Sequence, residues 1–138
     1  MNVLDENIVA SQRALLRAWR IPVRQIGQEV GRAGLKDPDV IPMLRRLGGP
    51  TFFTRDLGFY ERRLCPTGYC LICLGVGKDE VAVFVRRFLR QRAFATRAAR
   101  MGTVVHASQS GLRWWDLDSA AEHISAWSAS ARRRGRKQ

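Results

Sequence analysis

Short apolar runs alternate with amphipathic stretches along the chain. Runs of apolar or alternating residues predict strands at 2–5, 21–26, 51–54, 69–76, 103–107 and 112–117. The run at 69–76 is continuously apolar, which indicates a strand buried on both faces of a sheet. The last two runs flank the polar segment 108–111 and predict a β-hairpin.

Helical periodicity fills three of the segments between these strands. Leu16 and Trp19 are spaced to share one face of a helix after the first strand. A second helix is predicted to begin with Asp37 at its N-cap and Pro38 at its first helical position. A third follows Glu80 and carries its apolar side at Val81, Phe84, Val85, Phe88 and Leu89.

Strands that alternate with helices are typical of α/β proteins with a mainly parallel sheet. The chain has 138 residues, enough for one domain. We therefore expect residues 1–117 to form an α/β sandwich, to which the C-terminal hairpin adds an antiparallel edge. Residues 118–138 begin with an amphipathic stretch and end in the basic segment 132–137, which predicts a C-terminal helix and a disordered tail.

The chain is strongly basic, with 24 Lys and Arg against 12 Asp and Glu, a net charge of +12 and a pI near 11.3. Such a surface attracts polyanions, so nucleic acid is the first expected partner, ahead of an acidic protein or an anionic membrane. The longest apolar run is far shorter than the roughly 20 residues that span a bilayer. The first residues include acids where a signal peptide would carry basic residues, and three cysteines cannot all pair. We therefore expect a soluble cytoplasmic protein.

Five of the twelve acids are predicted to gather at one edge of the sheet. Asp5 and Glu6 follow the first strand, and Asp56 follows the third. Asp37 and Asp39 lie at the start of the helix after the second strand, which places them at the same edge. Ligands of parallel sheets bind beyond the carboxyl ends of the strands, so this edge is the candidate site.

Clustered carboxylates repel one another unless a cation neutralises them. Their hard oxygen atoms suit Mg²⁺ or Mn²⁺. A carboxylate-bound metal on a basic surface is what phosphodiester cleavage requires, because the metal activates water while Arg and Lys hold the backbone phosphates. The pattern does not decide between one ion and two.

Each acid also has an interpretation without a metal. Asp37 is explained as a helix N-cap, and Asp39 is favoured in a first helical turn by the helix dipole. Asp56 is compatible with a surface turn, and Glu6 with a side chain that points to solvent. Asp5 is the hardest to explain by packing, because it directly ends an apolar strand.

Three segments together resemble the PIN-like family. They are Leu4-Asp5-Glu6-Asn7, Gly34-Leu35-Lys36-Asp37-Pro38-Asp39-Val40 and Phe53-Thr54-Arg55-Asp56-Leu57-Gly58-Phe59. The resemblance covers roughly the first 95 residues. It implies a PIN-like α/β/α sandwich and an Mg²⁺- or Mn²⁺-dependent ribonuclease, a hydrolase that is often the toxin of a bacterial toxin–antitoxin pair.

The same resemblance implies roles for individual residues. By position, the metal-binding acids of the catalytic centre would be Asp5, Asp37 and Asp56. Glu6 and Asp39 would be supporting acids, Glu6 in catalysis and Asp39 in binding the metal. Thr54 would orient Asp56 or a metal-bound water, and Asn7 would position the loop or contact substrate.

Arginines supply the predicted RNA-binding surface. We expect Arg55, Arg86, Arg87 and Arg90 to contact RNA phosphates, although a solvated helix face also explains such a run. The tail 132–137 would add salt-sensitive affinity or be covered by an acidic antitoxin. The expected partners are RNA and a small antitoxin protein, with no membrane, and the sequence leaves a homodimer open.

The remaining reactive side chains favour structural roles. Cys70 and Cys73 have the spacing of a metal or redox pair, but residues three apart on a strand point to opposite faces. His106 and His123 have no partner at ligand spacing. The sequence therefore leaves two hypotheses, a metal-dependent endoribonuclease and a non-catalytic RNA-binding or protein-interaction module whose acids are caps and turn residues.

Overall fold

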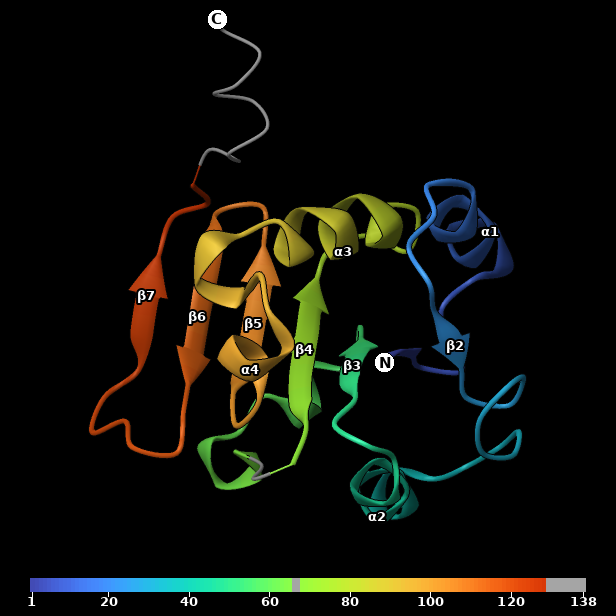
Figure 1. The fold of residues 1–138 in the computed structure, drawn as a ribbon, viewed down its shortest axis with the longest axis horizontal. Coiled ribbons are helices and arrows are strands. Elements are labelled where there is room, and N and C mark those ends of the chain that lie inside the picture. Colours follow the sequence, from blue (N-terminus) through green and yellow to red (C-terminus); the bar gives the residue numbers. More distant parts are fainter. Residues whose placement is uncertain (66–67, 129–138) are drawn as a thin grey trace, which may run out of the picture.

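The structure is a computed structural model that describes residues 1–65 and 68–128. These residues form an α/β fold on one seven-stranded sheet of order β2-β1-β3-β4-β5-β6-β7 (Figure 1). Strands β1 to β5 pair in parallel, and β5, β6 and β7 pair antiparallel. The strands are β1 (Asn2–Leu4), β2 (Arg24–Gln25), β3 (Thr51–Thr54), β4 (Cys70–Gly75), β5 (Val104–Ser108), β6 (Gly111–Trp115) and β7 (His123–Ser125).

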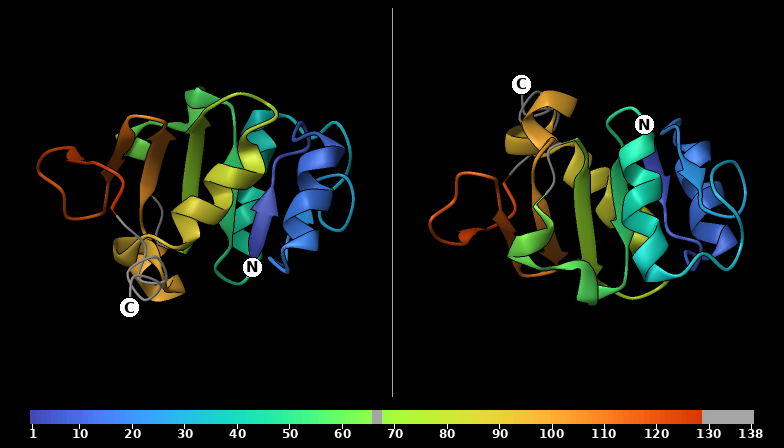
Figure 2. Two further views of the ribbon diagram at one scale, coloured as in Figure 1. Left: turned by 90° about the horizontal axis from the view of Figure 1, so that it is seen from above. Right: turned by 90° about the horizontal axis from the view of Figure 1, so that it is seen from below.

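Helices cover both faces of the sheet. In chain order they are α1 (Ala10–Ala18), α2 (Asp37–Arg46), α3 (Val81–Leu89) and α4 (Arg97–Arg100). Helix α3 lies on the face seen from above and α2 on the face seen from below (Figure 2). No helix in residues 1–65 and 68–128 has the length and apolar content needed to cross a membrane.

Alternation along the strands divides the core into two halves. Phe52 packs with α2 on one face, and Phe53 packs with α1 and α3 on the other. In β4, Leu71 and Ile72 make the same division, and neither is exposed. The prediction that this strand is buried on both faces is confirmed, as are the mainly parallel sheet and the C-terminal hairpin.

Three sequence predictions need correction. The strand predicted at 21–26 is reduced to Arg24–Gln25. Helix α2 begins at Asp37 with Lys36 as its N-cap, so the capping position lies one residue earlier than predicted. The helix predicted within 118–138 is wrong for the described part, because His123–Ser125 pairs with β6 as a strand. The predicted basic tail at 132–137 lies outside the described residues.

Candidate functional site

The carboxyl ends of β1 and β3 bring Asp5 and Asp56 to the two sides of one hydroxyl group. These strands are parallel neighbours, with Leu4 opposite Phe53. The Thr54 hydroxyl donates to Asp5 Oδ2 at 2.6 Å and accepts the Asp56 backbone N–H at 3.0 Å. Thr54 is fully buried, so this link is held firmly between the two acids. The ends of β1, β3, β4 and β5, with the loops that follow them, are called the carboxyl edge below.

Backbone amides hold the second oxygen of Asp5 and one oxygen of Asp56. Asp5 Oδ1 accepts the Glu6 N–H at 2.7 Å. Asp56 Oδ1 accepts the Gly58 N–H at 2.9 Å and so caps a short 3₁₀ helix at Leu57–Phe59. The turn interpretation of Asp56 therefore accounts for one carboxylate oxygen, on a side chain that stays exposed to solvent.

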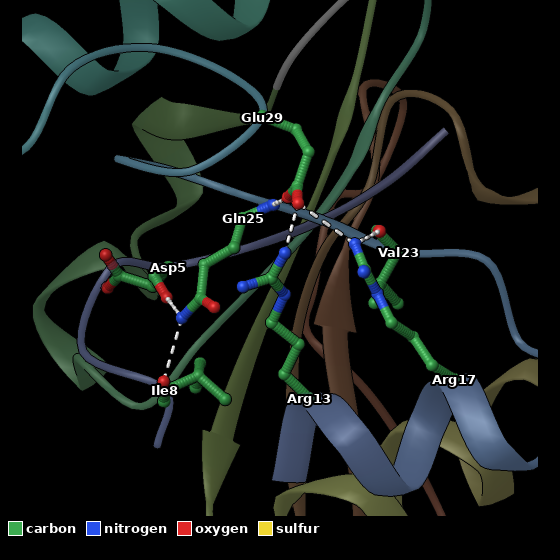
Figure 3. A network of polar contacts seen from close by, with 7 residues as sticks. All are labelled: Asp5, Ile8, Arg13, Arg17, Val23, Gln25 and Glu29. Carbon is green, nitrogen blue, oxygen red and sulfur yellow. Dashed lines mark hydrogen bonds and ion pairs between the residues drawn. The ribbon is translucent and has the colours of Figure 1, made fainter. Parts of the chain in front are cut away.

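Gln25 fixes the backbone that carries Asp5 (Figure 3). Its buried side-chain amide donates to the carbonyl oxygens of Asp5 at 3.0 Å and Ile8 at 2.8 Å. A weaker contact reaches the Glu6 carbonyl at 3.3 Å. One side chain of β2 thus satisfies several carbonyl groups of the loop after β1, which restricts where Asp5 can point.

Glu29 anchors Gln25 in turn (Figure 3). Its Oε1 accepts the Gln25 backbone N–H at 3.0 Å, and its Oε2 is paired with Arg13 and Arg17 of α1. The backbone hydrogen bond from Gln25, followed by the two arginines, lowers the pKa of the Glu29 carboxyl. Helix α1, the loop after β2 and the loop that carries Asp5 are therefore joined by one polar network.

The other predicted acids are placed differently. Both carboxylate oxygens of Glu6 accept the Gly34 N–H, at 2.9 and 2.8 Å, so Glu6 ties down the loop before α2 and does not point to solvent. Asp39 is exposed and borders a cavity of about 350 Å³ beside Arg32 and Arg46. The side chain of Asp37 lies outside what the structure describes.

Two of the predicted metal ligands, Asp5 and Asp56, are linked through Thr54, by the carboxylate of Asp5 and the backbone of Asp56. Among the side chains that the structure describes, which do not include that of Asp37, no group of three or more His, Cys, Asp or Glu is arranged to hold a metal ion. Asn7, predicted to contact substrate, is exposed in the loop directly after Glu6.

Glu80 is an acid at the carboxyl edge that the sequence analysis missed. It accepts the Gly77 N–H at 2.8 Å and the Gln109 side-chain amide at 2.9 Å, beside a cavity of about 410 Å³ beyond β4 and β5. Arg55 reaches the same region, where its Nε donates to the Val76 carbonyl at 2.9 Å. The signal was present, because Glu80 follows a buried strand at the start of a helix.

The predicted RNA-binding arginines of α3 lie over aromatic rings. The Arg86 guanidinium is 3.7 Å from the centroid of the Trp19 ring, and that of Arg87 is 4.5 Å from the Trp127 ring. Such cation–π contacts add stability and hold each charge at the surface. Arg90 is the C-terminal cap residue of α3 and is exposed.

Neither histidine is isolated in space, although both are isolated in sequence. The His106 ring lies 5.5 Å from that of Tyr60, and burial, followed by Arg113, lowers its pKa. His123 Nε2 is 3.3 Å from Asp116 Oδ2, and its ring stacks on Trp114. The contacts of His123 join β7 to β6 and to the turn after it, and the contact of His106 joins β5 to the loop that carries Tyr60.

The structural interpretation of the cysteines is confirmed. Cys70 and Cys73 are both buried in β4 and face opposite halves of the core, so they do not form a pair of ligands. Burial raises the pKa of each thiol to about 12. Both thiols are therefore protonated and protected from solvent at neutral pH.

We expect thiol reagents to distinguish the three cysteines. At pH 8, a colorimetric disulfide reagent should modify the half-buried Cys65 in the folded protein, and modify Cys70 and Cys73 only after guanidinium unfolds it. Cys65→Ser should remove the reaction seen without denaturant. Three thiols reacting at one rate in the folded protein would contradict this expectation.

Comparison of the chain with protein-family models, curated protein sequences and solved structures finds no match. Membership of the PIN-like family therefore stays a prediction from the three motifs. What bears on function in the structure is the arrangement at the carboxyl edge, above all the link from Asp5 through Thr54 to Asp56.

Proposed function

We propose that the protein is a metal-dependent endoribonuclease with a PIN-like fold, acting as the toxin of a toxin–antitoxin pair. One observation carries the proposal: at the carboxyl ends of adjacent parallel strands, the buried Thr54 hydroxyl bonds both the Asp5 carboxylate and the backbone N–H of Asp56. This is the edge where α/β sheets bind ligands. The net charge of +12 supports a phosphate-rich substrate.

The donor set at this edge fits Mg²⁺ or Mn²⁺. Each carboxylate oxygen has two lone pairs, so the hydrogen bonds to Asp5 and Asp56 leave capacity to bind a cation. Mg²⁺ keeps several waters and needs only one or two protein carboxylates. By motif position, Asp37 would be a further ligand. When bound, the ion would supply an activated water and stabilise charge on the phosphate.

The protein's own groups would position the substrate and the acids. Thr54 holds Asp5 and the backbone of Asp56 in fixed relation. Arg55 lies next to Asp56, and in the described part of the chain its guanidinium is bound only through Nε, so its two NH₂ groups are available to a phosphate. An acidic antitoxin would inhibit the enzyme by covering this basic surface.

Cleavage of a mixed pool of single-stranded and structured RNA tests the proposal. We expect the wild-type protein to cut with Mg²⁺ or Mn²⁺ and not with excess EDTA, and Asp56→Asn to lose about a hundredfold or more. Asparagine retains the oxygen that accepts the Gly58 N–H, so the variant should melt like the wild type. Full activity in EDTA, or in the variant, would contradict the proposal.

A second candidate is a non-catalytic RNA-binding module on the same scaffold. It is favoured by the structural bonds of Glu6 and Asp56, whose carboxylates accept backbone N–H groups. It predicts that wild type and Asp56→Asn both bind RNA with a steep salt dependence and that neither cuts. The same experiment therefore separates the two candidates.

A further inference from the structure

A second candidate site lies at the opposite ends of the strands. A cavity of about 760 Å³ opens where β1 and β2 begin, at the amino edge of the sheet. Among the described residues that line it, none is acidic and four are arginines: Arg17, Arg20, Arg24 and Arg100. The local potential is positive. Burial lowers the pKa of the Met1 amino group, and the positive charges of Arg97, Arg100 and Arg24 lower it further.

The four arginines divide into two fixed and two available groups. Arg17 pairs with Glu29 and donates to the Val23 carbonyl. Arg100 donates to the Thr51 hydroxyl and the Phe94 carbonyl. The guanidinium groups of Arg20 and Arg24 make no hydrogen bond or ion pair with any residue in 1–65 or 68–128, and both residues are exposed.

Arg20 occupies a backbone position that favours glycine. It directly follows the cap of α1 with φ of +62°, and it is the non-glycine residue with positive φ in the described chain. The Ile21 N–H donates to the Leu16 carbonyl at 3.0 Å across this turn, the geometry in which helices usually end on glycine. Arg20 therefore lines the cavity from a backbone conformation that is less favourable for arginine than for glycine.

Part of the cavity lining is apolar. It consists of Ile21, Pro22 and Val23, and a hydrogen bond of 3.1 Å from the Asn2 side-chain amide to the Pro22 carbonyl holds this part against β1. The volume lies within the range of small-molecule sites, which are mostly apolar with a few fixed polar groups. A cavity lined by unpaired arginines and by apolar residues suits a ligand that combines a phosphate with a flat, weakly polar body.

We propose that this cavity binds a nucleoside 5′-monophosphate unit. Arg20 and Arg24 bind the phosphate, and the wall of Ile21, Pro22 and Val23 packs against the nucleoside. The unit is either a free nucleotide or the 5′ end of an RNA chain. The site lies across the sheet from Asp5 and Asp56, so it goes beyond the proposed nuclease and does not depend on it.

Calorimetric titration of the full chain tests the site. EDTA removes any contribution from metal ions, and the buffer contains no phosphate that would compete for the arginines. We expect 5′-AMP to bind at least about tenfold more tightly than adenosine, and Arg20→Gly and Arg24→Gln each to weaken 5′-AMP about tenfold. Arg92→Gln removes an exposed arginine outside the cavity and should change nothing. Asp56→Asn should also bind like the wild type.

Thermal melting separates lost binding from lost structure. Arg20→Gly should melt at or above the wild-type temperature, because glycine adopts positive φ without strain. Two RNA 12-mers, one with a 5′-phosphate and one with a 5′-hydroxyl, show which ligand the site takes. If the protein prefers the 5′-phosphate and Arg20→Gly removes that preference, the ligand is the 5′ end of RNA. If the two RNAs bind equally, the ligand is the free nucleotide. No binding of 5′-AMP, equal binding of adenosine, or unchanged affinity in both arginine variants would overturn the site.

Discussion

Asp5→Asn is expected to reduce metal-dependent RNA cleavage by about 10²–10³-fold, the usual effect of removing one preorganised electrostatic group from a reaction centre. Asp5 accepts hydrogen bonds from the Thr54 hydroxyl and the Glu6 N–H, and Gln25 fixes its backbone. Asparagine has the same shape: its Oδ1 can accept the Glu6 N–H and its Nδ2 can donate to the Thr54 hydroxyl oxygen, but it lacks the negative charge that would attract the cation. Catalysis should therefore fall while the fold persists.

Single-turnover cleavage of one defined RNA measures this effect, with thermal melting of each protein alongside. Asp118→Asn is the matched control, because Asp118 is an exposed acid in the turn before β7. Cleavage by the control should equal that of the wild type. Wild-type cleavage by folded Asp5→Asn would remove Asp5 from the centre, and equal losses in both variants would point to net charge and not to position.

Local patterns were sufficient for the strands that carry the site. The strand predicted at 51–54 is β3 with the same bounds, and the run at 69–76 contains β4. Both strands are buried on both faces, so their composition reports their environment directly. β7 gave no such signal, because all three of its residues are exposed and its pairing with β6 requires the chain to reverse after Trp115.

The candidate site was predictable where it follows from topology and not where it depends on distant contacts. Asp5 and Asp56 end neighbouring parallel strands, so the strand order alone brings them close. The role of Glu6 was not accessible, since its partner, the Gly34 N–H, is 28 residues away in a loop without regular structure. The strained backbone of Arg20 likewise gave no sequence signal, because nothing local marks a left-handed arginine.

Phe88→Ala is expected to lower the free energy of unfolding by about 3–5 kcal/mol, the usual cost of truncating a buried aromatic side chain. Phe88 on α3 has no exposed surface and joins the helix to the sheet and to the segment after it. Its ring meets Phe53 of β3 edge-on at 6.1 Å and stacks on Phe94 at 5.0 Å. Alanine would leave a cavity between α3 and the sheet, and the backbone on either side is held in place and cannot move to fill it.

Equilibrium unfolding in guanidinium measures this loss, and Val83→Ala on the same helix is the control. Val83 is 44% exposed, so its truncation should change the free energy of unfolding by no more than about 0.5 kcal/mol. Domains are typically stable by about 5–15 kcal/mol, so Phe88→Ala should unfold at a much lower denaturant concentration. Equal midpoints for the two variants would show that α3 is not held by this aromatic cluster, and the site on β3 would then need another support.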